Sequence, residues 1–477
     1  MTRRESQLPR GALYVALGQA TFVLGGFALH IVLSRWLTPT LFGLFNVTMT
    51  ILVWSEIVVN NGVPVALQRF LPDENLAEAT VLRAAARCQA IIGLGLFAAM
   101  FLAAPLLAAL LRDPAMSGIL RLAFVDILAM SAYAYYRGVL NGWRVFRQLA
   151  LTIGAYSLTK VAAIVLLVLL GFGVSGALVG NIASSLGGLA MGFFWARRRK
   201  PGGQWVSVEG GRSVGEGEIM RFVLPAALFT LTSNILLGLD LMGVKAFVAD
   251  GDQVGYYSAA VKLAEAPRLV LLAFSFTLLP SLSRSIAARE PEQTRRYLQQ
   301  MIRMLALVLL PIVALVTTTA GGAIGLIFPP DYVSAAPVLA LLIASYALYT
   351  VYITLVTALL AEGRPVRALL IPLTLLPLEA VAVWLGVTRW GPVGAALASL
   401  SSVGTAAAVV VVYVFRRFRP AEGPLLRSLL RIGAASLVVG GLARLWNPVG
   451  WILVAAYGLL GLLYLGLLLA LGERIAI

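Results

Sequence analysis

Residues 149–196 read LALTIGAYSLTKVAAIVLLVLLGFGVSGALVGNIASSLGGLAMGFFWA and carry a single charged side chain, that of Lys160. A helix needs about 20 apolar residues to cross the hydrocarbon layer of a bilayer, so this stretch is long enough to cross it twice. The lipid interior offers no water to backbone amides, and both crossings must therefore be α-helices. Similar apolar runs recur along the whole chain, which we predict to be an all-α polytopic membrane protein.

The composition favours a membrane protein over a soluble one. Apolar residues make up 60% of the 477 residues, and only 12% are Asp, Glu, Lys or Arg, against roughly 25% in soluble domains. The formal net charge is +16, and the basic residues lie in short hydrophilic gaps between the apolar runs. Basic gaps of this kind are typical of the cytoplasmic loops of membrane proteins, so we expect no nucleic-acid partner.

Fourteen segments have the length and composition of transmembrane helices. They lie at 11–34, 43–66, 88–111, 118–140, 149–171, 174–196, 219–243, 254–280, 301–328, 336–361, 366–387, 393–415, 425–446 and 449–471. An even number places both termini on one side of the membrane, and the basic N-terminus favours the cytoplasm. In this arrangement 28 of the 37 Lys and Arg residues fall in cytoplasmic segments and 6 in outer segments.

The sequence repeats itself at a nearly constant spacing. Three matches occur in order along the chain: Gly43 with Gly255, Arg147 with Arg367, and Gly176 with Gly394. Two copies of a six-helix unit in the same orientation form a parallel pseudo-repeat with a cavity between the lobes. We predict an N-terminal lobe at 1–200, a cytoplasmic linker at 201–218, a C-terminal lobe at 219–419 and two additional helices at 420–477.

Several short motifs, spread in order over essentially the whole chain, resemble one family. They are Leu33-Ser-Arg-Trp-Leu-Thr-Pro-Thr-Leu-Phe-Gly-Leu-Phe45, Gly171-Phe-Gly-Val-x-Gly176, Asn234-x5-Asp240, Val254-Gly-Tyr-Tyr-Ser-Ala-Ala260 and Leu279-Pro-Ser-Leu-Ser283. Together they resemble polysaccharide flippases of the multidrug/oligosaccharidyl-lipid/polysaccharide (MOP) exporter superfamily. The resemblance implies alternating access between two six-helix lobes, an undecaprenyl-type lipid-linked oligosaccharide as substrate, and the bacterial inner membrane as location. Proteins of polysaccharide assembly are then candidate partners.

Ionisable side chains inside the membrane are the candidate functional residues, because a charge at bilayer depth is costly unless it faces a bundle interior or a water-filled cavity. Lys262, Glu265 and Arg268 follow one another at i, i+3 spacing and keep one net positive charge, which would attract a pyrophosphate. A self-satisfied ladder between helices is the alternative. The predicted substrate-binding residues are Lys160, Asn234, Lys262, Glu265 and Arg268.

Four acidic residues within the predicted spans are candidates for binding a coupling cation or proton. They are Glu56, Asp126, Asp240 and Glu379. A structural pair between Asp126 and Lys160 is an equal alternative, and Asp240 lies near a helix end where water could solvate it.

The sequence offers no motif for catalysis. One His and one Cys cannot form a metal-ligand cluster, and no G-x-x-x-x-G-K-[ST] phosphate loop is present. We therefore predict a transporter without a catalytic site, metal or cofactor. The alternatives are an ion-coupled multidrug or metabolite antiporter of the same superfamily, a peptidoglycan-precursor flippase, which is disfavoured because spans one and two lack the arginines of that subfamily, and a membrane-embedded polysaccharide polymerase, ligase or secretion subunit.

Overall fold

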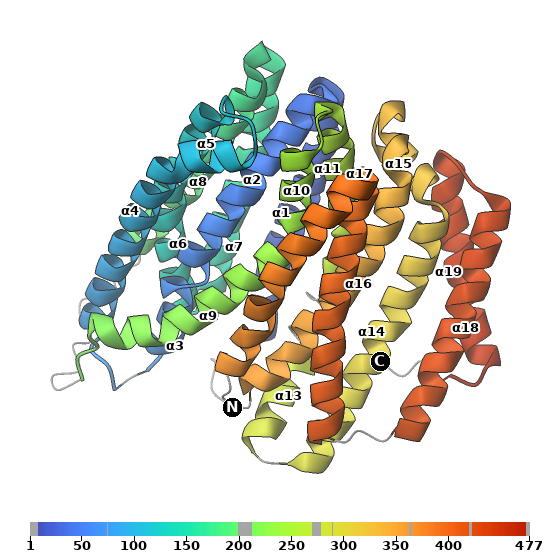
Figure 1. Cartoon of the computed structure of the whole chain (residues 1–477). Coiled ribbons are helices and arrows are strands. Elements are labelled where there is room, and N and C mark those ends of the chain that lie inside the picture. Colours follow the sequence, from blue (N-terminus) through green and yellow to red (C-terminus); the bar gives the residue numbers. More distant parts are fainter. Residues whose placement is uncertain are drawn as a thin grey trace. The chain divides into compact units, whose positions relative to one another are not determined.

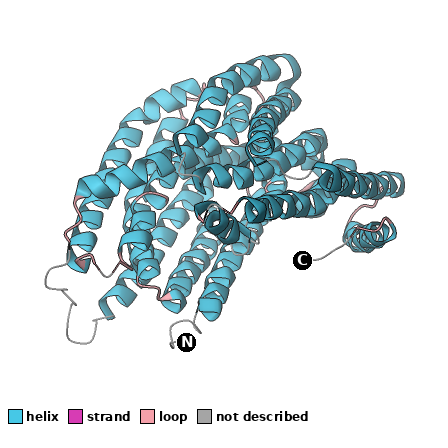
Figure 2. Cartoon of the chain, turned by 90° about the horizontal axis from the view of Figure 1, so that it is seen from below, coloured by secondary structure: helices cyan, strands magenta, loops and turns pink. Residues whose placement is uncertain are grey.

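The computed structural model describes residues 8–73, 75–198, 212–269, 278–288, 290–361, 365–418 and 422–473. Within these ranges almost all ordered structure is helical (Figure 2), and the one β-type pairing is an isolated bridge between Leu76 and Arg212. The prediction of an all-α polytopic fold is confirmed. The chain divides into two compact units, Met1–Asn234 and Ile235–Ile477.

The first unit is a bundle of mostly long helices (Figure 1). Its described residues form α1 (Leu8–Trp36), α2 (Pro39–Asn60), α3 (Val63–Phe70), α4 (Glu78–Leu110), α5 (Met116–Phe124), α6 (Asp126–Gly142), α7 (Phe146–Leu167), α8 (Gly173–Arg198) and most of α9 (Glu216–Leu236). Helix α8 packs against α2, α6 and α7. Side chains from these four helices therefore meet in the interior of the unit.

The second unit is also built of helices in its described part. It contains α10 (Leu239–Phe247), α11 (Gly251–Ala264), α13 (Leu278–Ala287), α14 (Pro291–Thr318), α15 (Ala320–Ile327), α16 (Ala336–Ala361), α17 (Pro365–Phe418), α18 (Glu422–Trp446) and α19 (Trp451–Ala470). Helix α16 packs against α11, α14 and α17, and α10 packs against α17. The interior of this unit thus lies where α10, α11, α16 and α17 meet.

Ten helical segments of the described chain are long and apolar enough to cross a membrane. Two of them, Phe146–Arg198 and Ala368–Phe418, are 53 and 51 residues long. At 1.5 Å per residue a straight helix of that length would extend about 75–80 Å, far more than the ~30 Å hydrocarbon layer. Each is instead a hairpin of two arms, and the hairpins supply four of the predicted spans.

A glycine with a positive φ angle turns each hairpin. Gly173 has φ 54° and ψ −136°, and Gly391 has φ 60° and ψ −142°. L-amino acids rarely adopt this conformation, whereas glycine does so readily. The spacing between the two glycines equals that between Gly176 and Gly394 in the sequence repeat. In the second hairpin Gly386 and Gly394 also face each other backbone to backbone.

A helix cap repeats at another spacing of the sequence repeat. Thr38 caps α2 by accepting a hydrogen bond from the N–H of Leu41, and Asp250 caps α11 by accepting one from the N–H of Asp252. A side-chain oxygen at the N-cap satisfies one of the free amides of the first helical turn. The two caps are separated in the sequence by the same interval as Gly43 and Gly255. Local backbone structure thus supports the repeat that the sequence suggested.

Four predicted spans are interrupted: 43–66, 118–140, 219–243 and 301–328. The break between α2 and α3 falls at Asn61 and Gly62, and Pro64 lies in the first turn of α3. Proline lacks the amide that would continue the preceding helix, but it is well suited to the first turn of a new one. An apolar run predicts a crossing without predicting whether the helix is continuous.

The predicted span 254–280 is only partly visible. Helix α11 ends at Ala264, and a 3-10 turn, Ala266–Leu269, follows it. Residues 270–277 lie outside the described part of the chain.

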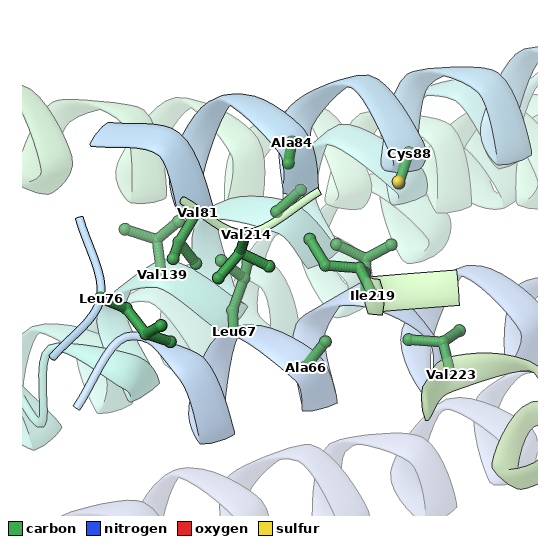
Figure 3. Packing of buried hydrophobic residues seen from close by; sticks show 12 residues of the cluster. Ala66, Leu67, Leu76, Val81, Ala84, Cys88, Val139, Val214, Ile219 and Val223 are labelled. Carbon is green, nitrogen blue, oxygen red and sulfur yellow. The ribbon is translucent and has the colours of Figure 1, made fainter. Parts of the chain in front are cut away.

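Within the first unit, residues 212–223 pack against α3 and α4 (Figure 3). The Arg212 N–H donates to the Asn75 carbonyl at 2.9 Å, and the Arg212 carbonyl accepts from Ala77 at 3.2 Å. Val214 and Ile219 then join a buried apolar cluster with residues of α3 and α4. The end of the predicted linker is therefore anchored by its backbone and by apolar packing.

The division into units falls at Asn234, inside α9, rather than at the predicted linker. Residues 201–211 of that linker lie outside the described chain. The lobe limits 1–200, 219–419 and 420–477 stay predictions.

The Glu473 carboxylate ties the end of the chain to α14 and α18. It accepts a hydrogen bond from Ser428 and lies 2.7 Å from Arg303 Nε and 3.6 Å from Arg431 Nη1. Burial disfavours the charged carboxylate, but the hydrogen bonds from Ser428 and Arg303 and the charges of both arginines outweigh it. The pKa of Glu473 consequently lies below its ordinary value.

Candidate functional site

The interior of the first unit holds a cluster of charged and polar side chains from α2, α6, α7 and α8. Asp126, at the start of α6, accepts a hydrogen bond from Asn181 Nδ2 of α8 at 2.6 Å. The Glu56 carboxyl of α2 lies beside that of Asp126, close enough to interact directly. Both acids are buried, with 7% of Glu56 and 0% of Asp126 exposed.

Lys160 of α7 supplies a positive charge to this cluster. Its ammonium interacts electrostatically with both Glu56 and Asp126. It also lies 3.5 Å from the Tyr156 hydroxyl and 5.6 Å from the centre of the Tyr156 ring. The structure therefore brings together three predicted residues, although we had assigned Lys160 to substrate and the two acids to a coupling ion.

The same interior continues toward one end of α6 through Tyr133 and Arg137, neither of which is among the predicted site residues. Tyr133 stacks on Tyr156 with ring centres 5.1 Å apart. Arg137 lies over the Tyr133 ring at 5.6 Å and donates from Nη2 to the Asn60 side chain at 2.9 Å. The signal for Arg137 in the sequence was its position one turn after Tyr133, on the same helix face.

The second unit holds a corresponding acidic cluster. Asp240 of α10 accepts hydrogen bonds from the Tyr257 hydroxyl at 2.6 Å and from the Leu241 N–H at 2.7 Å. Ser399 of α17 also interacts with the Asp240 carboxyl. Only 1% of Asp240 is exposed, so water does not solvate it here.

Glu379 of α17 is the neighbour of Asp240 and is fully buried. Neither of its carboxylate oxygens accepts a hydrogen bond from the described residues. In that part of the chain, no lysine or arginine forms an ion pair with Asp240 or Glu379. A buried carboxylate without a partner is costly, and a cation or a proton bound at this pair of acids would remove that cost.

The two clusters correspond in the repeat at some of their positions, but not acid for acid. The Asp126–Asn181 hydrogen bond of the first unit has its counterpart in a hydrogen bond between Ser345 and Ser399, 3.1 Å long, in the second. Both ends of this bond keep the spacing of the sequence repeat. Asn181 and Ser399 are not among the predicted site residues, although each follows a glycine of the matched pair Gly176 and Gly394 at the same distance.

The predicted triplet on the eighth span is split in the structure. Lys262 Nζ donates to Glu265 Oε1 at 3.0 Å, so this half of the ladder is formed. The Arg268 guanidinium instead lies over the ring of Tyr349, 5.7 Å from its centre. It interacts with Glu265 only through longer-range electrostatics.

Asn234 directs its side chain to its own helix. Its Nδ2 donates to the Thr230 carbonyl at 2.8 Å, and its backbone carbonyl accepts from Trp54 Nε1 at 3.2 Å. The Asn234 backbone therefore contributes to holding α9 in the first unit. The predicted contact of its side chain with a sugar stays a prediction.

The carboxyl groups of these clusters can bind and release a cation or a proton. In the described chain no group of three or more His, Cys, Asp and Glu side chains has the geometry of a metal site. The first unit offers two carboxyls with a lysine, and the second offers two carboxyls with hydroxyl groups. Carboxylate and hydroxyl oxygens are suitable ligands for a hard cation such as Na⁺, and a carboxylate can also take up a proton.

Comparison with known proteins gives one family and one fold. A family model described as "Polysaccharide biosynthesis protein" matches residues 8–286, more than half of the chain. No curated protein matches the sequence significantly.

Several solved transporters share the fold. A structure described as "Lipid II flippase MurJ, inward closed conformation" matches with a TM-score of 0.74 at 15% identity, covering 95% of this chain and 97% of that one. An inward-facing multidrug resistance MATE family transporter of the MOP superfamily matches with a TM-score of 0.70 at 14% identity, covering 83% and 94%. A MOP superfamily transporter from Pyrococcus furiosus matches with a TM-score of 0.59 at 16% identity, covering 86% and 95%.

Proposed function

Because the chain belongs to the polysaccharide biosynthesis protein family, we propose that it flips a polyprenyl-pyrophosphate-linked oligosaccharide across the cytoplasmic membrane by alternating access. The observation that carries the proposal is the presence of buried charge clusters in helices that are otherwise apolar. Charges are retained at bilayer depth chiefly where they serve a substrate or ion pathway. The fold shared with a lipid II flippase supports the same class of activity.

The proposed roles divide the charged residues by sign. Arg268 and Lys262 of the second unit, with Glu265, attract and orient the anionic pyrophosphate. Lys160 and Asn234 of the first unit contact the substrate as well. The acids Glu56 and Asp126, and separately Asp240 and Glu379, bind the coupling cation or proton. The opposite charges of cargo and ion allow one movement of the protein to carry both without a large net charge in the membrane.

The orientation follows from the distribution of basic residues. With 28 of the 37 Lys and Arg residues in cytoplasmic segments, we propose an inner-membrane protein with both termini in the cytoplasm. The substrate would then be loaded where cytoplasmic glycosyltransferases assemble it and released to polysaccharide-assembly proteins outside.

An ion-coupled multidrug or metabolite antiporter is the second candidate. The fold shared with a MATE family transporter, at a TM-score of 0.70, favours it. The acid clusters would serve such an antiporter equally well, so the two candidates differ in what the basic residues bind.

Complementation tests the flippase. A strain that lacks its own polysaccharide flippase should recover surface polysaccharide when it expresses this chain. Charge reversal at Arg268 should abolish that recovery at unchanged membrane abundance, whereas Arg427→Gln, at an exposed position of α18, should not. If the wild-type chain restores no polysaccharide but drives cation-dependent efflux of a dye such as ethidium, the antiporter replaces the flippase.

A further inference from the structure

Two charged positions of the second unit correspond to two positions of the first, with the signs exchanged. Glu56 and Arg268 are separated by the same interval as the helix caps of α2 and α11, Thr38 and Asp250. The spacing from Lys160 to Glu379 falls between the spacings of the two sequence matches that flank it. At both positions an acid in one unit stands where the other unit has a base.

In the first unit the two positions bring opposite charges together. The Glu56 carboxyl and the Lys160 ammonium interact electrostatically within one buried cluster. The helices that carry them are α2 and α7, both of which pack against α8. The packing of α2 and α7 against α8 therefore allows side chains of opposite charge at these two positions to attract each other.

In the second unit the corresponding charges stand apart. Arg268 rests over the Tyr349 ring at 5.7 Å. Glu379 is fully buried, and neither of its oxygens is hydrogen-bonded by the described residues. The electrostatic interaction between these two positions in the first unit thus has no counterpart between Arg268 and Glu379 here.

A chain of polar groups connects the two separated charges. Tyr346 of α16 interacts electrostatically with both Arg268 and Asp240. Tyr257 of α11 is hydrogen-bonded to Asp240 and also interacts with Glu379. Helix α16 packs against the 3-10 turn that carries Arg268, against α11, which carries Tyr257, and against α17, which carries Glu379. Helix α10, which carries Asp240, packs against α11 and α17. Arg268 and Glu379 therefore belong to one continuous interior.

The charges in this interior allow the Glu379 carboxylate to exchange one cationic partner for another. A buried carboxylate without a partner is strongly unfavourable, so Glu379 attracts whichever cation can reach it. The cations available are an exogenous ion and the guanidinium of Arg268, which an aromatic face holds here in place of a carboxylate. An arginine that is drawn to Glu379 is no longer available to an anion.

We propose that Arg268 and Glu379 are an exchangeable ion pair. They close when the acids Asp240 and Glu379 are ionised and hold no exogenous cation, and they separate when a cation neutralises those acids. Cation binding at the acids and anion binding at Arg268 then strengthen each other by the same factor, as linkage requires. The inference rests on the proposed function in taking the anion to be the pyrophosphate head of a polyprenyl lipid.

A double-mutant cycle tests the pair without reference to transport. Arg268→Glu and Glu379→Arg are made singly and together, and thermal unfolding is followed in cation-depleted buffer at pH 8 with choline chloride as the salt. Each single reversal should lower Tm by 5 °C or more, and the double exchange should recover more than half of the summed loss. A double variant that loses the full sum overturns the proposal. If a reversal does not yield folded protein, Arg268→Gln and Glu379→Gln give the same cycle.

Binding of farnesyl pyrophosphate to the protein in lipid nanodiscs tests the linkage. In the same buffer Glu379→Gln should bind the probe at least fivefold more tightly than the wild type, because Arg268 is then free. Glu292→Gln, at an exposed acid of α14 outside the proposed site, is the control and should leave the affinity unchanged. An unchanged or weaker affinity in Glu379→Gln, or an equal gain in Glu292→Gln, overturns the proposal. If even the wild type fails to bind the probe, the proposed substrate is wrong, and the thermal cycle alone decides whether the pair exists.

Discussion

The two units carry buried acids on the same scaffold, but they neutralise them differently. In the first unit Glu56 and Asp126 lie with the ammonium of Lys160 and an amide hydrogen bond from Asn181. In the second unit Asp240 and Glu379 have hydroxyl and amide donors, all of them on Asp240, and form no ion pair with a base of the described chain. The first unit thus has a lysine of its own beside its acids. The acids of the second unit have no basic partner in the described chain and depend on an external cation.

This difference suggests a division of work between the units. A cluster that contains a covalently attached cation cannot release it, so its charge changes little during a transport cycle. A cluster that depends on an external cation changes charge whenever that ion binds or leaves. We therefore expect the coupling ion to bind chiefly at Asp240 and Glu379, and to bind at Glu56 and Asp126 only in competition with the ammonium of Lys160.

Supplying the second unit with its own cation should have the largest effect. Glu379→Lys places an ammonium beside Asp240, at the position that Lys160 occupies in the first unit. Because no external cation is then required, polysaccharide output in the complementation assay should fall more than 100-fold while membrane abundance stays within twofold of the wild type. Retained output would contradict a role of Glu379 in ion binding. Loss of the protein itself would mean that the acid serves the fold.

Removing the cation of the first unit should destabilise that unit. Lys160→Met leaves two neighbouring carboxyls buried without their base, which costs about 3 kcal/mol if the cluster behaves like other buried pairs that lose one partner. Thermal unfolding should show a lower Tm, and the second substitution in Lys160→Met/Glu56→Gln should restore much of the loss. If Lys160→Met unfolds at the wild-type temperature, Lys160 faces a solvated space and its substrate role gains support.

Substitution of the hairpin glycines should lower the stability of the protein equally in the two units, whereas substitution of the buried charged residues should not. Gly173→Ala and Gly391→Ala each force an L-residue into a sparsely populated backbone region, at a cost of about 1–2 kcal/mol. Gly433→Ala, in the middle of α18 with no atom near its Cβ position, is the matched control and should be neutral or slightly stabilising. Thermal unfolding of the three variants measures this. A loss at only one hairpin would show that the two turns are not equivalent.

Substitution of Glu473 should give the smallest loss of stability. Its carboxylate is paired with Arg303 and Arg431 outside the membrane-spanning interior of the second unit. Glu473→Gln should lower stability by about 1 kcal/mol at neutral pH, because it loses hydrogen bonds assisted by charge. The pKa of this carboxyl is depressed in the folded protein, so its contribution is fully present above the unfolded pKa near 4.3 and is lost as pH falls through the folded value. Unfolding measured from pH 7 downward should show the difference between wild type and variant shrinking only below about pH 4. A difference that persists in stronger acid would assign the effect to packing.

The sequence predicts most of the fold because apolar length and charge position report directly on membrane crossings. Segments 149–171 and 174–196 were placed on either side of the turn at Gly173 because small residues interrupt an apolar run there. The break at Gly62 was not predicted, since hydropathy does not depend on whether a helix continues. The free energy that the helix break at Gly62 costs depends on the tertiary contacts of α3, and the local sequence does not show these contacts.

The candidate site was predicted only as a set of charges. Glu56 and Asp126 stand out because acids are rare in apolar helices. That they lie side by side depends on how α2 packs against α6, and three other helices separate these two along the chain. Tyr257 could not be distinguished from an ordinary buried aromatic until the partner of its hydroxyl, Asp240, was located.

The glycine turns at Gly173 and Gly391 have a consequence for how the protein is made. Each joins two apolar arms with almost no polar loop between them, so nothing hydrophilic has to pass through the membrane between one arm and the next. A lone first arm would leave its end among lipid chains without the partner that packs against it. We therefore expect each hairpin to leave the insertion machinery as one piece, with its arms already paired when they first meet lipid.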